Sequence, residues 1–188
     1  MLRHWGEALQ HGVFVYTSNV DGLFQKAGFN RLRIEECHGS LHRFQCQAPC
    51  SPDTWTADGF NPVVDVGRCE LVGELPVCPH CRSVARPNVL MFDDREWITK
   101  HQVAQSLRRQ SWLEGVRRPV IIEIGAGLNI PNVRHFAQRL AHQHNGALIR
   151  INPHDSHVGA LPGVGIANGA LQTIVDIDAL IGARRLCA

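Results

Sequence analysis

Four of the seven cysteines form two close pairs. Cys46 and Cys50 make the first pair, Cys78 and Cys81 make the second, and 27 residues separate the pairs. Two such pairs supply four thiolates, which is the tetrahedral ligand set that zinc prefers. A shell of four cysteines leaves no open coordination position, so we expect one structural zinc ion per chain rather than a catalytic one.

Other interpretations of the cysteines stay open. The four thiols could be buried free thiols or a redox pair. Cys69 lies between the pairs and could replace one ligand, and His42 and His80 are nearby nitrogen donors. We expect Cys37 and Cys187 to be ordinary buried or terminal cysteines.

The composition is that of a chain with a sizeable core. Its 188 residues are 44% hydrophobic and 19% charged, which excludes disorder for most of the length. The net charge is +2 and the basic residues fall in scattered pairs, so a specific nucleic-acid partner is not expected. No apolar run approaches the roughly 18 residues of a membrane span, and no signal-peptide block is visible. We therefore expect a soluble, cytoplasmic protein with no membrane partner.

Helices and strands alternate outside a central irregular region. Helices are predicted over residues 2–12, 23–28, 95–113, 132–146 and 169–182, and strands over residues 13–17, 31–39, 119–125 and 147–152. This alternation predicts an α/β fold with a parallel sheet and helices on its faces. Residues 44–87 are rich in Cys, Pro, Gly, Asp and Asn, so a ligand such as zinc must hold them in place.

Six short motifs follow one another along the chain. They are Thr-Ser-Asn-Val-Asp-Gly at residues 17–22, Cys-His-Gly-Ser at 37–40, the two cysteine pairs, Arg-Pro-Asn-Val-Leu-Met-Phe at 86–92, Gly-Ala-Gly-Leu at 125–128 and Ile-Asn at 151–152. Each motif alone is weak, but in this order around a zinc knuckle they resemble the sirtuin family. Sirtuins consume NAD as a co-substrate to remove acyl groups from lysine side chains of proteins.

The resemblance implies a Rossmann-like parallel sheet with a small inserted zinc-binding module. Residues 1–43 and 88–188 would form the Rossmann-like part, and residues 44–87 the zinc-binding module. Nothing before Asn19 matches the family's first strand, its Gly-Ala-Gly-x-Ser phosphate loop or its Pro-x-Phe-Arg segment. We therefore expect an incomplete sheet, lacking the first strand, and weak binding of NAD by this chain alone. A fragment, a misplaced start codon and a degenerate paralogue all stay possible.

The resemblance also implies the catalytic residues. Asn19 and Asp21, with Ser18 and Val20 beside them, match the segment that holds the nicotinamide ribose and carboxamide. His38 matches the general base that takes a proton from the nicotinamide ribose hydroxyl after the acyl oxygen attacks the anomeric carbon. An imidazole suits this task because its ordinary pKa of about 6.5 lies near the operating pH.

Two further groups of residues complete the implied site. The loop that approaches the dinucleotide is matched by Gly125, Ala126 and Gly127. The residue that contacts the adenine ribose is matched by Asn152. The residues that pair with an extended acyl-lysine peptide are Val89, Leu90, Met91 and Phe92.

Three departures from the family pattern weaken inferences about rate and affinity. Ser18 replaces the usual Gln, and Asp93 and Asp94 replace Gly-Glu. Ala126 and Gly127 replace Thr-Ser, which removes two hydroxyls, although backbone N–H groups could still serve.

Without the resemblance, the same residues have simpler explanations. His38 could be a structural histidine, residues 19–22 a turn and helix cap, and residues 125–127 a strand-to-helix turn. Two alternatives to a deacylase also stay open. One is a non-catalytic, zinc-stabilised interaction or NAD-sensing module, and the other is an NAD hydrolase or ADP-ribosyl transferase on the same scaffold.

Overall fold

The computed structural model describes the backbone of residues 1–186 and the side chains of residues 1–182. The chain forms two compact units. One, here called the terminal unit, joins Met1–Phe14 to the part of the chain from Gln110 onward. The other, here called the cysteine unit, is Val15–Arg109. Cys187 lies outside the described residues.

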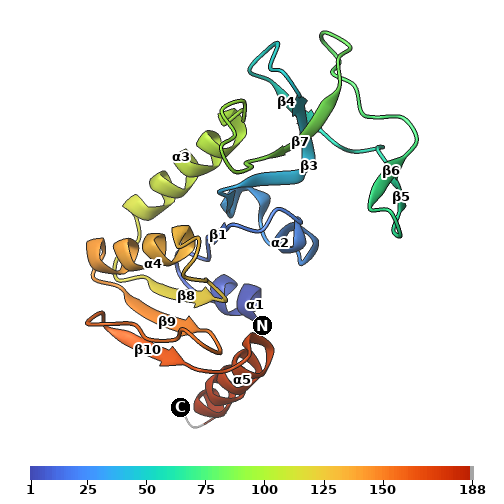
Figure 1. The fold of residues 1–188 in the computed structure, drawn as a ribbon. Helices are drawn as coiled ribbons and strands as arrows, with labels where there is room; N and C mark the ends of the chain where they lie inside the picture. Colours follow the sequence, from blue (N-terminus) through green and yellow to red (C-terminus); the bar gives the residue numbers. More distant parts are fainter. Residues whose placement is uncertain (187–188) are drawn as a thin grey trace. The chain divides into compact units, whose positions relative to one another are not determined.

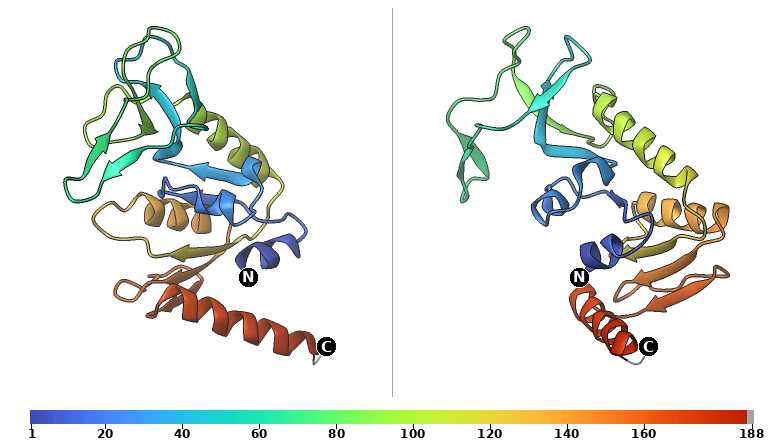
Figure 2. Two further views of the ribbon diagram at one scale, coloured as in Figure 1. Left: turned by 90° about the vertical axis from the view of Figure 1, so that its right-hand side faces the viewer. Right: turned by 180° about the vertical axis from the view of Figure 1, so that it is seen from behind.

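A three-stranded parallel sheet forms the centre of the terminal unit. Its strands follow the order β10-β9-β8 and are β8 (Val120–Ile124), β9 (Ala147–Ile151) and β10 (Gly163–Ile166). Helix α4 (Asn132–Gln143) lies along this sheet, as Figure 2 shows. Ala137 and Ala141 of α4 pack against Leu148 of β9, and these small side chains let the helix approach closely.

Two further helices of the terminal unit are α1 (Leu2–Glu7) and α5 (Ala170–Leu186). The indole N–H of Trp5 in α1 donates to the carboxylate of Asp178 in α5 at 2.5 Å. This contact ties the first residues of the terminal unit to its last helix. No helix within residues 1–186 is long and apolar enough to cross a membrane.

The cysteine unit is built from short strands around β3 (Gly39–Cys46). β3 pairs antiparallel with β4 (Thr54–Thr56) on one side and with β7 (Ala85–Val89) on the other. The remaining elements are a parallel pair, β1 (Val15–Thr17) with β2 (Ile34–Glu36), the short helices α2 (Leu23–Lys26) and η1 (Arg31–Arg33), and an antiparallel ribbon of β5 (Val63–Asp65) and β6 (Glu70–Val72). Figure 1 shows this ribbon standing apart from the β4-β3-β7 sheet. Helix α3 (Lys100–Glu114) follows β7 in the chain.

The predicted α/β class with parallel strand pairs is confirmed. β10 was not predicted, because its sequence Gly-Val-Gly-Ile contains two glycines, which are poor strand formers. The strand predicted over residues 31–39 is the shorter β2, and β3, which begins at Gly39, was not predicted. Residues 44–87 are less irregular than expected, since they contain β4, β5, β6, the end of β3 and the start of β7. The division into residues 1–43, 44–87 and 88–188 stays a prediction.

A buried amide network explains why α3 begins at Lys100 rather than at Arg95. The Gln45 side chain is fully buried, and its oxygen accepts from the Asn88 amide at 2.7 Å and from the Ile98 backbone at 3.0 Å. The Gln45 amide nitrogen donates to the Glu96 carbonyl at 2.8 Å. Backbone groups of residues 96 and 98 are thereby committed to β3 and β7, so they are not used in a helix.

A second buried network joins β2 to α3. Glu35, which is 2% exposed, accepts from Arg109 at 2.6 Å and from Gln102 at 2.8 Å. Gln105 accepts from the backbone N–H of Glu36 at 3.0 Å, and its amide lies 3.3 Å from the His101 ring. Polar side chains of α3 therefore contact β2 rather than solvent.

The turn between β2 and β3 requires a glycine. Gly39 has φ +82°, and a Cβ built there would lie 2.0 Å from the carbonyl oxygen of Asn88. The β3–β7 pairing brings the two backbones this close, since Gly39 faces Val89 in the register. A side chain at position 39 would push β7 away from the start of β3, which directly follows His38.

We predict that Gly39→Ala destabilises the protein more than Gly59→Ala does. Gly59 has nearly the same φ, +83°, but nothing lies within 4 Å of the position that a Cβ would take there, so it is a matched control for backbone strain. Urea unfolding should give a free energy of unfolding lower by more than about 1 kcal/mol in Gly39→Ala than in Gly59→Ala. Equal values would show that β7 does not approach Gly39 closely.

We also predict that His101 makes stability depend on pH. Burial, followed by the charges of Arg43 and Arg108, lowers the pKa of His101 from 6.5 to about 4. Between these values the unfolded chain binds a proton that the folded chain does not, so the free energy of unfolding falls as the pH falls from 6.5 to 4. Urea unfolding of His101→Gln should show a shallower pH dependence in this window. His142→Gln, at an exposed position of α4, should behave like the wild type, and an unchanged slope in His101→Gln would contradict the prediction.

Candidate functional site

Four cysteine sulfurs lie close together in the cysteine unit. The Sγ atoms of Cys46, Cys50, Cys78 and Cys81 are all within 4.8 Å of one another. Cys46 and Cys81 are 3.6 Å apart, as are Cys50 and Cys78. Four sulfurs at about 2.3 Å from a tetrahedral zinc ion would be about 3.8 Å apart. The cluster can therefore hold one zinc ion.

Strand pairing brings these cysteines together. Cys46 is the last residue of β3 and faces Ala85 of β7, so the turn that precedes β7 lies beside the end of β3. That turn carries Cys78 and Cys81 and is closed by a bond of 2.7 Å from the Cys78 N–H to the Ser83 carbonyl. The two pairs are distant in sequence but meet at one end of the β3–β7 ladder.

The thiols differ in acidity. Hydrogen bonds from the side chain and backbone of Ser83 lower the pKa of Cys81 to about 6. The hydrogen bond to Cys81 raises the pKa of Cys50 to about 12. Zinc binds thiolates, so loading the cluster displaces thiol protons and is weaker at low pH.

The alternative ligands lie elsewhere. Cys69 is exposed at the β5–β6 turn, where its sulfur contacts the carbonyl of Val66. The His42 ring bonds to the carbonyl of Asp21 at 3.0 Å, and the His80 ring lies 3.7 Å from the Asp53 carboxylate. None of the three belongs to the group of four sulfurs.

The two predicted catalytic motifs are neighbours in the same unit. β1 and β2 are parallel, so the segments that follow them leave the sheet at the same edge. The Cys37 N–H donates to the Thr17 carbonyl at 2.9 Å, and the Leu41 N–H donates to the Val20 carbonyl at 2.9 Å. These bonds enclose residues 18–20 on one segment and residues 38–40 on the other, so Asn19 and His38 are carried by adjacent loops.

Residues 18–21 combine exposure with local turn bonding. Asn19 is exposed, and its N–H donates to the Thr17 hydroxyl at 3.1 Å. The Asp21 carboxylate accepts from the Leu23 N–H at 3.0 Å at the start of α2. This bond closes a local turn just before α2, whose N-cap residue is Gly22. Ser18, Asn19 and Val20 remain at least partly accessible.

The predicted peptide-pairing segment continues from an edge strand. β7 is the last strand in the order β4-β3-β7, and the Leu90 N–H beyond it donates to the His38 carbonyl at 2.9 Å. Met91 and Phe92 are 61% and 85% exposed, which is unusual for such large apolar side chains. A β-strand edge with exposed apolar side chains is a surface on which an extended peptide can add.

An ion pair shapes this segment. Arg86 of β7 contacts the Asp94 carboxylate at 2.8 Å and the Val89 carbonyl at 3.3 Å. Asp93 has φ +56°, a left-handed backbone conformation that favours glycine. Glycine is the residue that the family pattern has at this position. Asp94 stands in the position of the usual Glu and remains a paired carboxylate.

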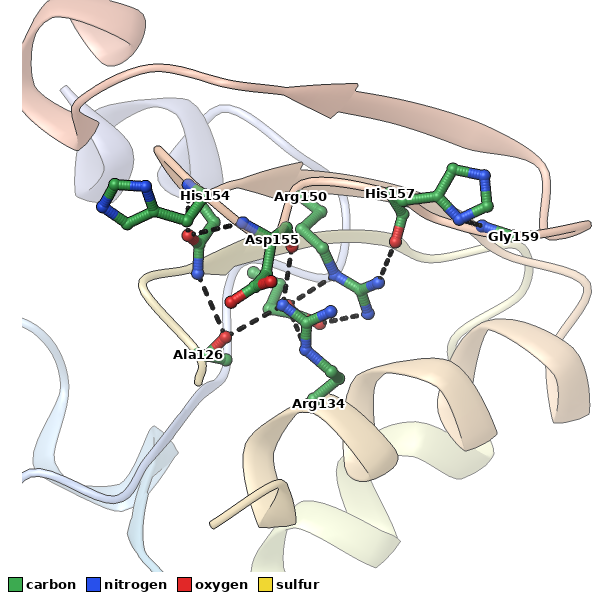
Figure 3. Close-up of polar contacts among 9 residues, drawn as sticks. Ala126, Arg134, Arg150, His154, Asp155, His157 and Gly159 are labelled. Carbon is green, nitrogen blue, oxygen red and sulfur yellow. Dashed lines mark hydrogen bonds and ion pairs between the residues drawn. The ribbon is translucent and has the colours of Figure 1, made fainter. Parts of the chain in front are cut away.

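The terminal unit holds the other predicted nucleotide residues. Figure 3 shows the polar network below the loops that follow β8 and β9. Glu123 of β8 and Arg150 of β9 form a buried pair through two bonds, of 2.6 Å and 2.9 Å. Arg150 also donates to the His157 carbonyl. The pair joins neighbouring strands just before the loops that carry Gly125 and Asn152.

The Asn152 side chain organises these loops. Its oxygen accepts from the backbone N–H groups of His154 and Asp155, both at 3.0 Å. Its amide nitrogen donates to the Ala126 carbonyl at 3.1 Å. One amide hydrogen of Asn152 is left for any further partner, and its assignment to the adenine ribose stays a prediction.

Three buried charges in this network were not expected from the sequence. Glu123 and Arg150 each interrupt an otherwise apolar strand, at residues 119–125 and 147–152, and that interruption is a usable signal of a buried ion pair. Arg134 gives no such signal, because a lone arginine on an amphipathic helix normally faces solvent.

A model of the Sir2 family matches residues 1–130. The chain belongs to the Sir2 family. Its relatives include NAD-dependent protein deacylase 2 of Corynebacterium efficiens, which is 28% identical over 161 residues, or 85% of this chain. The NAD-dependent protein deacylase of Thermococcus sibiricus is 24% identical over 167 residues, or 86% of this chain. The matches cover 57% and 58% of these two relatives, so this Sir2 chain spans little more than half of their length.

Solved structures share the fold of this Sir2 chain. A mutant Sir2 homologue in complex with ADP ribose has a TM-score of 0.63 and 23% identity, over 92% of this chain and 61% of the other. A Sir2 protein bound to acetylated peptide has a TM-score of 0.62 and 17% identity, over 90% of this chain and 63% of the other. The resemblance to sirtuins inferred from the motifs is confirmed, and the roles of individual residues stay predictions.

We predict that this Sir2 chain binds one zinc ion through Cys46, Cys50, Cys78 and Cys81. Because binding of a structural zinc contributes directly to folding, chelation should unfold residues 44–87. Metal analysis after purification without chelators should give one equivalent, and hydrogen exchange in residues 44–87 should accelerate when a chelator is added. Cys69→Ser should keep its zinc and Cys81→Ser should lose it. Less than half an equivalent in the wild type, or loss of zinc in Cys69→Ser, would contradict this ligand set.

Proposed function

We propose that this chain carries the catalytic and peptide-binding residues of an NAD-dependent protein lysine deacylase. The observation that carries the proposal is the bond from the Leu90 N–H to the His38 carbonyl. It couples the segment of the predicted general base directly to the exposed edge on which an acylated peptide would pair. The deacylases among the relatives support this assignment.

Each predicted residue then has a specific task. Bound NAD would supply an anomeric carbon that forms a bond to the acyl oxygen as its bond to nicotinamide breaks, and nicotinamide would leave. His38 would take the proton from the ribose hydroxyl, and Asn19 and Asp21, with Ser18 and Val20 beside them, would orient the ribose and carboxamide. Val89, Leu90, Met91 and Phe92 would align the acyl-lysine peptide through backbone bonds, with apolar contacts from the exposed side chains. Gly125, Ala126 and Gly127 would approach the dinucleotide, and Asn152 would contact its adenine ribose.

A cytoplasmic location belongs to the same proposal. The zinc ligands must stay reduced to bind metal, and reducing compartments keep such thiols free.

A second function is favoured by one relative. A probable bifunctional ADP-ribose hydrolase/ADP-ribosyltransferase of Fusarium oxysporum f. sp. cubense is 28% identical over 145 residues, or 70% of this chain. NAD cleavage of that kind would use Asn19, Asp21 and His38 without the peptide edge. Nicotinamide release that does not depend on an acylated peptide would favour this second function.

We predict that His38→Ala lowers the rate of NAD-dependent deacylation of an acyl-lysine peptide by about 10²–10⁴-fold, the usual effect of losing a positioned proton-transfer group. NAD affinity should change little, because the imidazole acts on a proton rather than on binding. Asn19→Ala should also raise the concentration of NAD needed, since it removes an orienting contact.

His142→Ala, at an exposed site, is the matched control for loss of a histidine and should leave the rate unchanged. Mass spectrometry of the peptide and a nicotinamide assay would be run in parallel on the same samples. Equal deacylation with and without His38 would make that imidazole structural. Wild-type protein that cleaves neither peptide nor NAD would favour the non-catalytic module.

A further inference from the structure

The peptide group between Ala126 and Gly127 is held from one side by two buried donors. The Ala126 carbonyl accepts from Arg134 at 3.0 Å, as Figure 3 shows, and from the Asn152 amide at 3.1 Å. A carbonyl oxygen has two lone pairs, so both are occupied. The orientation of this peptide group is therefore determined by side chains beneath the loop.

A fixed carbonyl also fixes the next N–H. In a trans peptide the C=O and the following N–H point in opposite directions, and the described chain has no cis peptide bond. With the Ala126 carbonyl turned toward the buried network, the Gly127 N–H is turned away from it. No described group accepts a hydrogen bond from this N–H. Gly127 is exposed, and among the described residues nothing beyond its chain neighbours lies within 4 Å of the position that a Cβ would take there, so the loop is open to a ligand at Gly127.

Arg134 also leaves a surplus of positive charge behind this loop. Its residue is 7% exposed, and its guanidinium spans the loops by donating to the Ala126 carbonyl and, at 2.7 Å, to the Asp155 carbonyl. Arg150 already bonds both oxygens of Glu123, whereas the Arg134 Nε lies 3.9 Å from Glu123 and has no hydrogen-bond partner. Glu123 is the one carboxylate within 4 Å of either guanidinium among the described residues, so two buried cations share one anion.

A buried cation without full compensation favours an anion nearby. We propose that Arg134 is a positioning residue for the nucleotide. It holds the Ala126 carbonyl inward so that the Gly127 N–H is presented outward, and it supplies the positive charge that favours a phosphate oxygen as the acceptor. In this chain the outward Gly127 N–H and the positive charge of Arg134 take the place of the Thr-Ser hydroxyls of the family loop. The proposal rests on the proposed use of NAD and assigns part of its recognition to a residue outside the matched motifs.

The test is nuclear magnetic resonance of the full chain with AMP, adenosine and ADP-ribose as probes, because amide shifts report weak binding residue by residue. ADP-ribose and AMP should shift the Gly127 amide, and AMP should bind about tenfold more tightly than adenosine, as expected for a charge-assisted hydrogen bond. No shift of the Gly127 amide with ADP-ribose, or equal binding of AMP and adenosine, would overturn the proposal.

Two substitutions separate positioning from simple structural support. Arg134→Gln removes the charge and should abolish the preference for AMP over adenosine, while Arg134→Lys keeps the charge and should retain the preference with weaker binding of both. Arg139→Gln, at an exposed site on the same helix, makes the same charge change and should behave like the wild type. Unchanged β8 and β9 amide shifts would show that the variants are folded.

An AMP preference that survives in Arg134→Gln overturns the role of the charge. If Arg134→Gln does not fold, Arg134→Lys still tests the positioning, because an ammonium group cannot reproduce the guanidinium bonds to the Ala126 and Asp155 carbonyls, so the Gly127 response to ADP-ribose should weaken while the preference for AMP is kept. These measurements contain no peptide and no turnover. A chain that binds AMP as described but removes no acyl group would refute the proposed function and leave this inference standing.

Discussion

The antiparallel pairing of β3 with β7 is the interaction on which the cysteine unit depends. The pairing runs from Gly39 opposite Val89 to Cys46 opposite Ala85, and its register shifts between Ser40 and Phe44. At one end it brings Cys46 beside the turn that carries the second cysteine pair. At the other end it brings the segment of His38 beside Leu90. The metal cluster and the candidate catalytic residue thus lie at opposite ends of one strand pair, on either side of the register shift, and each end depends on its own pairing of β3 with β7.

Buried side-chain amides rather than apolar packing strengthen this ladder. Gln45 and Asn88 lie on the paired strands and bond to each other and to the backbone of residues 96 and 98. Unsatisfied amides would be costly in this buried position, and here their bonds are matched by the neighbouring strand and loop. Such a network selects one arrangement of strands, whereas apolar side chains of similar size would tolerate several.

The terminal unit uses buried charges in a comparable way. Glu123 and Arg150 join β8 to β9, and Arg134 of α4 reaches the carbonyls of the two loops that follow these strands. The apolar core of Ala137, Ala141 and Leu148 fixes the helix on the sheet, and Arg134 of the helix then bonds to the two loops. Loop conformation at the carboxyl ends of parallel strands, where α/β proteins bind ligands, is therefore set by residues that need not touch a ligand themselves.

The sequence by itself determined the α/β class, most element positions, the four cysteines and the family, because apolar periodicity, thiol spacing and ordered motifs are local properties of the chain. Tertiary structure decided that Cys69 stays outside the cysteine cluster, that Gln45 and Asn88 delay the start of α3, and that Arg134 is buried rather than solvated. Each of these outcomes depends on which distant backbone groups lie within hydrogen-bond or metal-ligand distance. Strand register sets those distances, and register is a property of paired segments that neither segment specifies alone.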